Sequence, residues 1–163
     1  MKPILQRYAS YHLWANKELV SVLAKLTPEQ ATLNLGGSFE NMRALVWHAW
    51  DAESTWYQRL QLEEKVIRPS EQFTGSFAEG CAAWLRQSAL LAEWVAAATP
   101  ARIDHIVAFT RQKNQHFKMP VADIIMHACN HATFHRGQMV FMLRQLGITR
   151  IPSTDFSTFS LKK

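Results

Sequence analysis

Three histidines recur at intervals of four residues in the C-terminal half of the chain: His127, His131 and His135. In an α-helix, residues four apart lie about 5–6 Å apart on one face, so two neighbouring imidazoles can converge on one ion. Each step of four residues turns the side chain by roughly 40°, so a third histidine drifts round the helix. This spacing is typical of a divalent metal site and does not show which two of the three histidines bind.

His48 offers a further ligand from a separate segment. It shares a helical face with Leu45, Ala52 and Trp56, which predicts an inward-facing imidazole. Two ligands from one helix and one from a facing helix suit the core of a bundle, and three ligands leave a position open for water or substrate. The alternative is that each inward histidine is only hydrogen-bonded within the core.

The histidine-bearing face also carries Ile124, Phe134, Gln138 and Met142, which predicts that it faces an apolar interior. Gln138 is therefore expected either to hydrogen-bond a ligand or substrate, or to be a satisfied core amide.

The remaining histidines, His12, His105 and His116, lie outside this face and are expected to be partly exposed or capping residues. Candidates for an acid or a base beside the metal are Asp51, Glu53, His127 and His12, and spacing singles out none of them.

Several other kinds of site are excluded by their missing motifs. No Glu-x-x-His sequence of the di-iron bundles occurs, and neither does the His-Glu-x-x-His of zinc proteases. Gly-x-Gly-x-x-Gly and the phosphate-binding Gly-Lys-Ser/Thr loop are absent, so nucleotide cofactors lack support.

The composition predicts one folded domain over residues 1–163, because 48% of the residues are hydrophobic and 19% are charged. No apolar run reaches the roughly 18 residues of a membrane span, and the polar N-terminus does not resemble a secretory signal, so a cytoplasmic location is expected. The net charge of +5 is scattered among the predicted elements, which argues against nucleic acid as the main partner. Cys81 and Cys129 lie in helical patterns and cannot form a disulfide framework.

Four segments show the helical period. The first runs from about Pro3 to Leu26, and the second starts at Ser38 as N-cap and runs to about Leu60. The third begins with the capping box Ser76-Phe77-Ala78-Glu79 and ends before Thr99-Pro100. The fourth runs from Pro120 to Leu146, where Gly147 can adopt the left-handed closing conformation.

The connections are less regular. Residues 61–75 are expected to form a long connection, and 148–163 an extended tail. Between the third and fourth helices, Ile103, Val107 and Phe109 precede residues 111–114 in a pattern that predicts a short hairpin.

These patterns indicate an all-α antiparallel four-helix bundle or a close variant. Apolar residues surround the fourth helix, so it is expected to lie centrally and also to pair with a second copy in a homodimer. The residues concerned are Ile124, Ile125, Met126, Val140, Phe141, Met142 and Leu143.

The sequence Asn130-His131-Ala132-Thr133-Phe134-His135-Arg136-Gly137-Gln138 resembles the signature of the DinB/YfiT-like family of metal-dependent bacterial proteins. Three further similarities extend the resemblance over nearly the whole chain: Tyr11-His12-Leu13-Trp14-Ala15-Asn16, His48 before an aromatic-rich stretch, and Pro152-Ser153-Thr154-Asp155.

The resemblance implies an up-down-down-up four-helix bundle, commonly dimeric, in which His48, His131 and His135 hold a divalent metal, often zinc or nickel. His127 then becomes a neighbouring or pocket residue. Gly137 is expected to let another helix approach closely, and Asp155 to orient a histidine or to cap a turn.

Relatives of this kind include transferases that use low-molecular-weight thiols, thiol-dependent isomerases and hydrolases of amide-like bonds. The resemblance therefore implies a metal-dependent enzyme, with transfer of a thiol to a small electrophilic substrate as the preferred reaction. The alternatives are a metal-dependent hydrolase and a stress-related dimeric bundle that binds metal without turnover.

Overall fold

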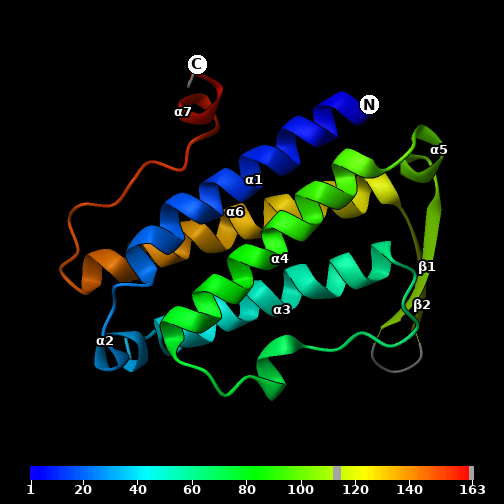
Figure 1. The fold of residues 1–163 in the computed structure, drawn as a ribbon. Coiled ribbons are helices and arrows are strands. Elements are labelled where there is room, and N and C mark those ends of the chain that lie inside the picture. Colours follow the sequence, from blue (N-terminus) through cyan, green and yellow to red (C-terminus); the bar gives the residue numbers. More distant parts are fainter. Residues whose placement is uncertain (112–114, 162–163) are drawn as a thin grey trace.

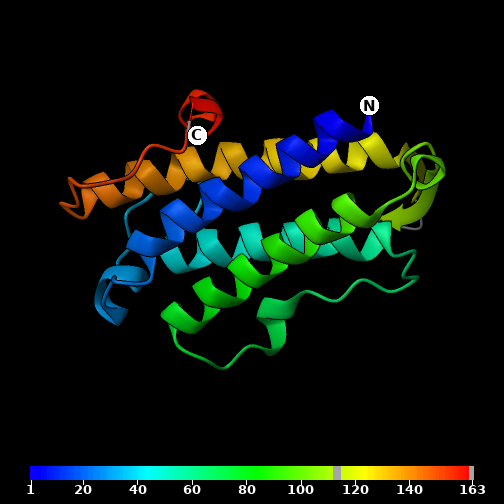
Figure 2. The same ribbon diagram turned by 45° about the horizontal axis from the view of Figure 1, so that its top comes forward.

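The structure, a computed structural model, describes residues 1–111 and 115–161. Four long helices form its core: α1 (Lys2–Leu23), α3 (Met42–Leu60), α4 (Phe77–Ala97) and α6 (Val121–Gln145). Helices α1 and α3 each pack against both α4 and α6. Figures 1 and 2 show that α1 and α6 run in one direction and that α3 and α4 run in the other.

Shorter elements connect these helices. They are α2 (Pro28–Thr32), the 3-10 helix η1 (Pro69–Gln72), α5 (Pro100–Ile103), β1 (Ile106–Arg111), β2 (Gln115–Pro120) and α7 (Phe156–Leu161). Strands β1 and β2 pair antiparallel from Ile106 opposite Pro120 onward, so the expected hairpin is present. Residues 112–114 of its expected turn lie outside the described residues.

The ends of the long helices follow local capping rules in most cases. Ser76 and Glu79 form the expected capping box of α4, and Gly147 has a φ of +79° after α6. The second long helix begins later than expected, because Asn41 and not Ser38 caps it: Asn41 Oδ1 accepts a hydrogen bond from Ala44 N at 2.9 Å. The first ends earlier, at Leu23, and Thr27 then starts α2 with a capping box of its own.

The sequence predicted that the C-terminal segment is extended, but the structure shows that it contains the short helix α7. The reason is a tertiary contact with α1. The Tyr11 ring lies 5.0 Å from that of Phe156 and 5.7 Å from that of Phe159, and the Tyr11 hydroxyl donates to Thr154 O at 2.9 Å. These aromatic contacts stabilise a turn of helix that local propensity does not favour.

The interior consists of two apolar clusters with a polar layer between them. On α1, Leu5 and Ala9 belong to one cluster and Leu19 and Leu23 to the other. The polar layer lies between these pairs, where α1 carries His12 and Asn16, both fully buried. Among the helices of the described residues, none is long and apolar enough to span a membrane.

Candidate metal centre

Three of the predicted ligands come together where α3 faces α6. One imidazole nitrogen from each of His48, His131 and His135 lies within 4.8 Å of the other two. His48 comes from α3, and His131 and His135 come from successive turns of α6. Their rings are close, with centroids 4.3 Å apart for His131 and His135 and 4.6 Å apart for His48 and His135.

The spacing of the ring nitrogens suits a shared ion. His131 Nε2 and His135 Nε2 are 3.1 Å apart. Two nitrogens bound at about 2.0–2.1 Å to a tetrahedral ion are about 3.3–3.4 Å from each other, so these two need to move very little. Imidazole is a favoured ligand of zinc and nickel, so the donor set fits a divalent transition metal. Three protein ligands leave at least one coordination position for another molecule.

Gln138 fixes the orientation of His135. Gln138 Oε1 lies 2.7 Å from His135 Nδ1, and a carbonyl oxygen can only accept, so Nδ1 carries the proton and Nε2 keeps its lone pair. A hydrogen bond of this kind sets the tautomer of a metal-binding histidine and raises its basicity. Gln138 therefore acts on the cluster through His135.

An aromatic side chain closes one side of the cluster. The Phe39 ring lies 4.9 Å from His48 and 5.7 Å from His135. Phe39 comes from the segment between α2 and α3, although the sequence predicted it as the first residue of the second helix, directly after Ser38.

The other side opens into a cavity of about 790 Å³, whose wall includes His48 and His131. His127 also lines it, with its ring 4.8 Å from Trp56 and 5.7 Å from His131. His127 thus lines the cavity and lies outside the three-histidine group. Asp51 lines the same cavity, and its carboxylate accepts hydrogen bonds from Ser70 N and Oγ.

The surroundings keep the three imidazoles neutral. Burial, followed by repulsion from His135, His48 and His127, lowers the pKa of His131 to about 4. Burial also lowers the pKa of His48, with His135 as the next cause, and burial lowers that of His135. A neutral imidazole is the form that binds a metal, so protons compete only weakly for this site near neutral pH.

The metal-free protein should therefore lose stability in mild acid. In the unfolded chain His131 takes up a proton near its ordinary pKa of 6.5, whereas in the folded chain it does so at about 4. Between pH 6.5 and pH 4 the unfolded state binds more protons than the folded state, so the fraction of unfolded protein grows as the pH falls. We expect the urea midpoint of metal-free protein to decrease between pH 7 and pH 4.5, and to decrease less in His131→Gln. An equal decrease in both proteins would contradict this assignment, and His105→Gln, at an exposed position, serves as the control.

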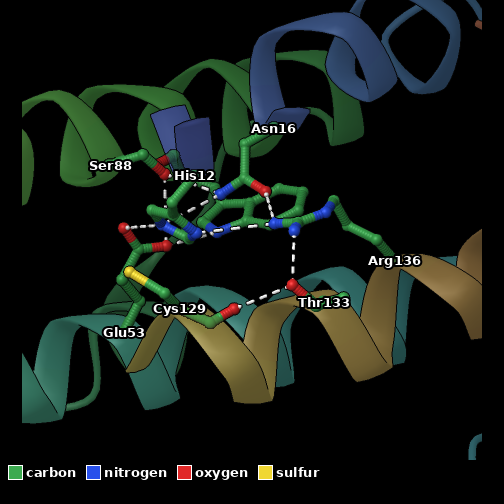
Figure 3. Close-up of polar contacts among 8 residues, drawn as sticks. His12, Asn16, Glu53, Ser88, Cys129, Thr133 and Arg136 are labelled. Atoms are coloured by element: carbon green, nitrogen blue, oxygen red, sulfur yellow. Dashed lines mark hydrogen bonds and ion pairs between the residues drawn. The ribbon is translucent and has the colours of Figure 1, made fainter. Parts of the chain in front are cut away.

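Two of the candidate acid–base residues lie in the polar layer and not in the cavity. His12, expected to be partly exposed, is fully buried, and Glu53 is 3% exposed. His12 Nε2 lies 2.9 Å from Glu53 Oε1, and Trp84 Nε1 and Ser88 Oγ donate to Glu53 Oε2 at 2.9 and 3.1 Å. The side chains of His12 and Glu53 thus face partners on other helices, as Figure 3 shows.

Arg136 completes this polar layer from α6. Its guanidinium donates to Asn16 Oδ1 at 2.8 Å and to Thr133 Oγ1 at 2.6 Å, and Nη1 lies 3.4 Å from His12 Nδ1 (Figure 3). Since a guanidinium only donates, His12 Nδ1 accepts and its Nε2–H donates to Glu53. A neutral imidazole thus bridges a buried carboxylate and a buried guanidinium.

Three further expectations need correction. Phe134, placed by the sequence on the inward face, is 64% exposed, because it is a quarter-turn from His135 on the outer side of α6. A Cβ added at Gly137 would meet nothing within 4 Å, so no helix in the described part of the chain approaches closely there. Asp155 does not orient a histidine, because it is exposed; its carboxylate accepts a hydrogen bond from Ser153 Oγ within the C-terminal segment, which fits the alternative of a local turn contact.

Arg59 and Arg68 also line the cavity and were not predicted as site residues. Arg59 could have been found, because it follows His48 by eleven residues, three turns along the same face of α3. Arg68 lies in the irregular segment before η1, where no periodicity indicates a direction.

The chain is similar to known proteins over most of its length. The model of the DinB family matches residues 1–160. Protein DinB of Bacillus subtilis strain 168 is 23% identical over 166 aligned residues, which cover 91% of this chain and 89% of that protein. The crystal structure of a DinB-like protein from Bacillus cereus ATCC 10987 superposes with a TM-score of 0.69 at 20% identity, over 88% of this chain and 91% of the other.

Proposed function

Since the chain belongs to the DinB family, we propose that it is an up-down-down-up four-helix bundle whose His48, His131 and His135 bind a divalent metal, zinc or nickel, for catalysis. The preferred reaction is transfer of a low-molecular-weight thiol to a small electrophile. The observation that carries the proposal is the cluster of three neutral imidazoles, of which two, those of His48 and His131, lie in the wall of a cavity of about 790 Å³. A structural metal site would instead be closed by a fourth protein ligand.

A divalent ion held there would lower the pKa of a bound thiol and so supply a thiolate at neutral pH. The chain's own groups complete the site. Gln138 holds His135 in the tautomer that binds, and the Phe39 ring packs against His48 and is not part of the cavity wall. His127, which lines the cavity beside His131, accepts the thiol proton.

The reaction is tested with 1-chloro-2,4-dinitrobenzene and a panel of small thiols. The thiol sulfur forms a bond to the ring carbon, chloride leaves with the bonding pair, and the thiol proton passes to His127 and from there to water. We expect zinc- or nickel-loaded protein to catalyse this transfer, and chelator-treated protein to lose at least about 90% of the rate, since the ion supplies the thiolate.

Two results would contradict the proposal: transfer that persists after chelation, or no transfer above background with any thiol in the panel. Metal-dependent hydrolysis of amide substrates in a parallel assay, without thiol transfer, would favour the hydrolase alternative. Metal binding without either reaction would favour the non-catalytic bundle.

We also propose that the protein is a homodimer through the outer face of α6. Phe134 and Phe141 are 64% and 62% exposed on this face, and Met126 is 52% exposed. Apolar side chains exposed together on one helix mark an interaction surface more often than isolated ones do. Light scattering of the purified protein tests this: a molar mass of two chains supports it, and that of one chain contradicts it.

A further inference from the structure

A row of exposed residues runs along the outer face of α6. Between Asp123 and Arg144 at its ends lie Met126, Asn130, Phe134, Gly137 and Phe141, all of them exposed. Successive members are three or four residues apart in the sequence, which places them on one side of the helix over about six turns. We call these residues the outer row.

Gly137 lines a hollow in the outer row. The hollow measures about 350 Å³, and its wall includes Phe134, Gly137, Gln138 and Phe141 together with residues 36–39 of the segment before α3. The four α6 residues have the spacing i, i+3, i+4 and i+7. Such a set of four forms the hole that receives one side chain of a facing helix in knobs-into-holes packing.

The described part of the same chain does not explain the glycine at position 137. An added Cβ there would meet no atom within 4 Å, although glycine inside a helix destabilises it relative to alanine. A glycine in a helix is useful where another backbone approaches closely. Since no described helix of this chain approaches Gly137, we expect the approaching helix to belong to another chain.

The two ends of the outer row carry opposite charges. Asp123 lies in the first turn of α6 and Arg144 in its last turn, and neither forms an ion pair with another residue of the described chain. Two copies of α6 packed antiparallel about a two-fold axis bring each Asp123 next to the Arg144 of the other copy. Parallel packing brings like charges together at both ends, which is unfavourable. The charge pattern therefore favours a second copy of this helix, in antiparallel order, as the partner of the outer row.

The pairing of the end charges determines which residues meet in the middle. Residues equally far from the two ends lie opposite each other, so Met126 lies opposite Phe141 and Asn130 lies opposite Gly137. The first pair joins two apolar side chains that are 52% and 62% exposed in the single chain. The second pair directs the Asn130 side chain of one copy into the hollow of the other.

Gln138 offers a hydrogen-bond donor in this hollow. Its Oε1 accepts from His135 Nδ1 at 2.7 Å, and its Nε2 makes no hydrogen bond to another residue that the structure describes. The Oδ1 atom of an asparagine side chain can accept a bond from such an amide. A contact between Asn130 of one copy and Gln138 of the other therefore acts on a predicted metal ligand.

We propose that two copies of the protein pair their outer rows in antiparallel order, with Asp123 against Arg144 at both ends, and that Asn130 of each copy binds Gln138 of the other. Each copy then contributes a residue to the hydrogen-bonded chain that orients His135 of the other copy. The pairing rests on the homodimer proposed above, and its effect on the metal site rests on the proposed function.

Exchange of the end charges tests the pairing in metal-free protein. Sedimentation equilibrium at low ionic strength measures the Kd of the dimer. Asp123→Arg and Arg144→Asp should each raise this Kd about 10-fold, because each turns two attractive contacts into two repulsive ones. The double variant should restore the original Kd. Glu93→Arg, which makes the same change of charge at an exposed position on α4, is the control and should leave the Kd unchanged.

Cross-linking at single cysteines tests the orientation separately. In antiparallel order the two copies of Phe134 lie beside the two-fold axis, whereas the two copies of Met126 are roughly 22 Å apart along the helices. We expect a short bis-maleimide to join the chains of Phe134→Cys and not those of Met126→Cys. Cys81 and Cys129 are buried, so they should not react in the folded protein.

The effect on the metal site is tested by the response of the dimer to zinc. Zinc is expected to lower the Kd of the dimer at least about 5-fold, since coupling between dimer formation and metal binding is reciprocal. Asn130→Ala, at an exposed position, should remove this zinc effect without loss of helical circular dichroism. Gln72→Ala removes an exposed amide outside the outer row and should preserve the effect.

The outcomes separate this inference from the proposed function. A single chain at every protein concentration overturns the pairing together with the homodimer and leaves the metal site standing. A Kd that neither single charge exchange alters overturns the antiparallel pairing alone. A zinc effect that persists in Asn130→Ala, or no zinc effect in protein that binds zinc, overturns the contact with Gln138. Charge exchange with the expected result, in protein that does not bind zinc, supports the pairing and contradicts the proposed function.

Discussion

Replacing His131 by alanine is expected to lower the affinity for zinc or nickel at least about 100-fold, because loss of a residue that merely orients a ligand already costs 10- to 100-fold. His131 lies close to both other members of the cluster: its Nε2 is 3.1 Å from that of His135, and its ring centroid is 5.4 Å from that of His48. Without it, two imidazoles from different helices remain, too few to hold an ion against the solvent. Metal analysis after dialysis, together with competition against a chelator, measures the change.

The matched control is His105→Ala, which removes an exposed histidine before β1. It should bind metal as the unaltered protein does, and both variants should keep the same helical circular dichroism. Retention of a full equivalent of metal by folded His131→Ala, with unchanged affinity, would rule out this site. His127→Ala should retain the metal too, because His127 lies outside the three-histidine group.

The sequence predicted the four long helices and two successive ligands on one helix face, since both depend on local periodicity. It did not choose between the pairs His127/His131 and His131/His135 by spacing, because both are four residues apart. Each step of four residues rotates the side chain by roughly 40° round the helix, so the two pairs point in different directions: His135 faces His48, whereas His127 faces Trp56. Only the position of α3 relative to α6, a tertiary property, makes that distinction.

The buried layer shows why His12 was misplaced. Its partners Glu53 and Arg136 lie 41 and 124 residues away in the sequence, so no window of periodicity contains them. A histidine without visible partners is expected at the surface, because burial of an unpaired polar group is costly. The same reason explains α7, which depends on the distant Tyr11.

Glu53→Ala is expected to lower the free energy of unfolding by about 3–5 kcal/mol, because each buried donor that loses its acceptor costs about 1–3 kcal/mol and several donors bind this carboxylate. Glu53 is 3% exposed and accepts hydrogen bonds from His12, Trp84 and Ser88. The substitution leaves these three donors without their acceptor and leaves the buried guanidinium of Arg136 without a compensating carboxylate across His12. Urea denaturation followed by circular dichroism measures the loss.

Glu93→Ala removes a carboxylate from an exposed position on α4 and should change stability by no more than about 0.5 kcal/mol. Glu53→Gln keeps an acceptor oxygen for one or two of the donors but removes the charge, so its loss should lie between those of the two alanine variants. A loss in Glu53→Ala no larger than that in Glu93→Ala would show that the layer does not stabilise the fold. Because none of its members is among the three clustered histidines, the folded fraction of Glu53→Gln should still bind one metal ion per chain, which separates the stabilising layer from the metal site.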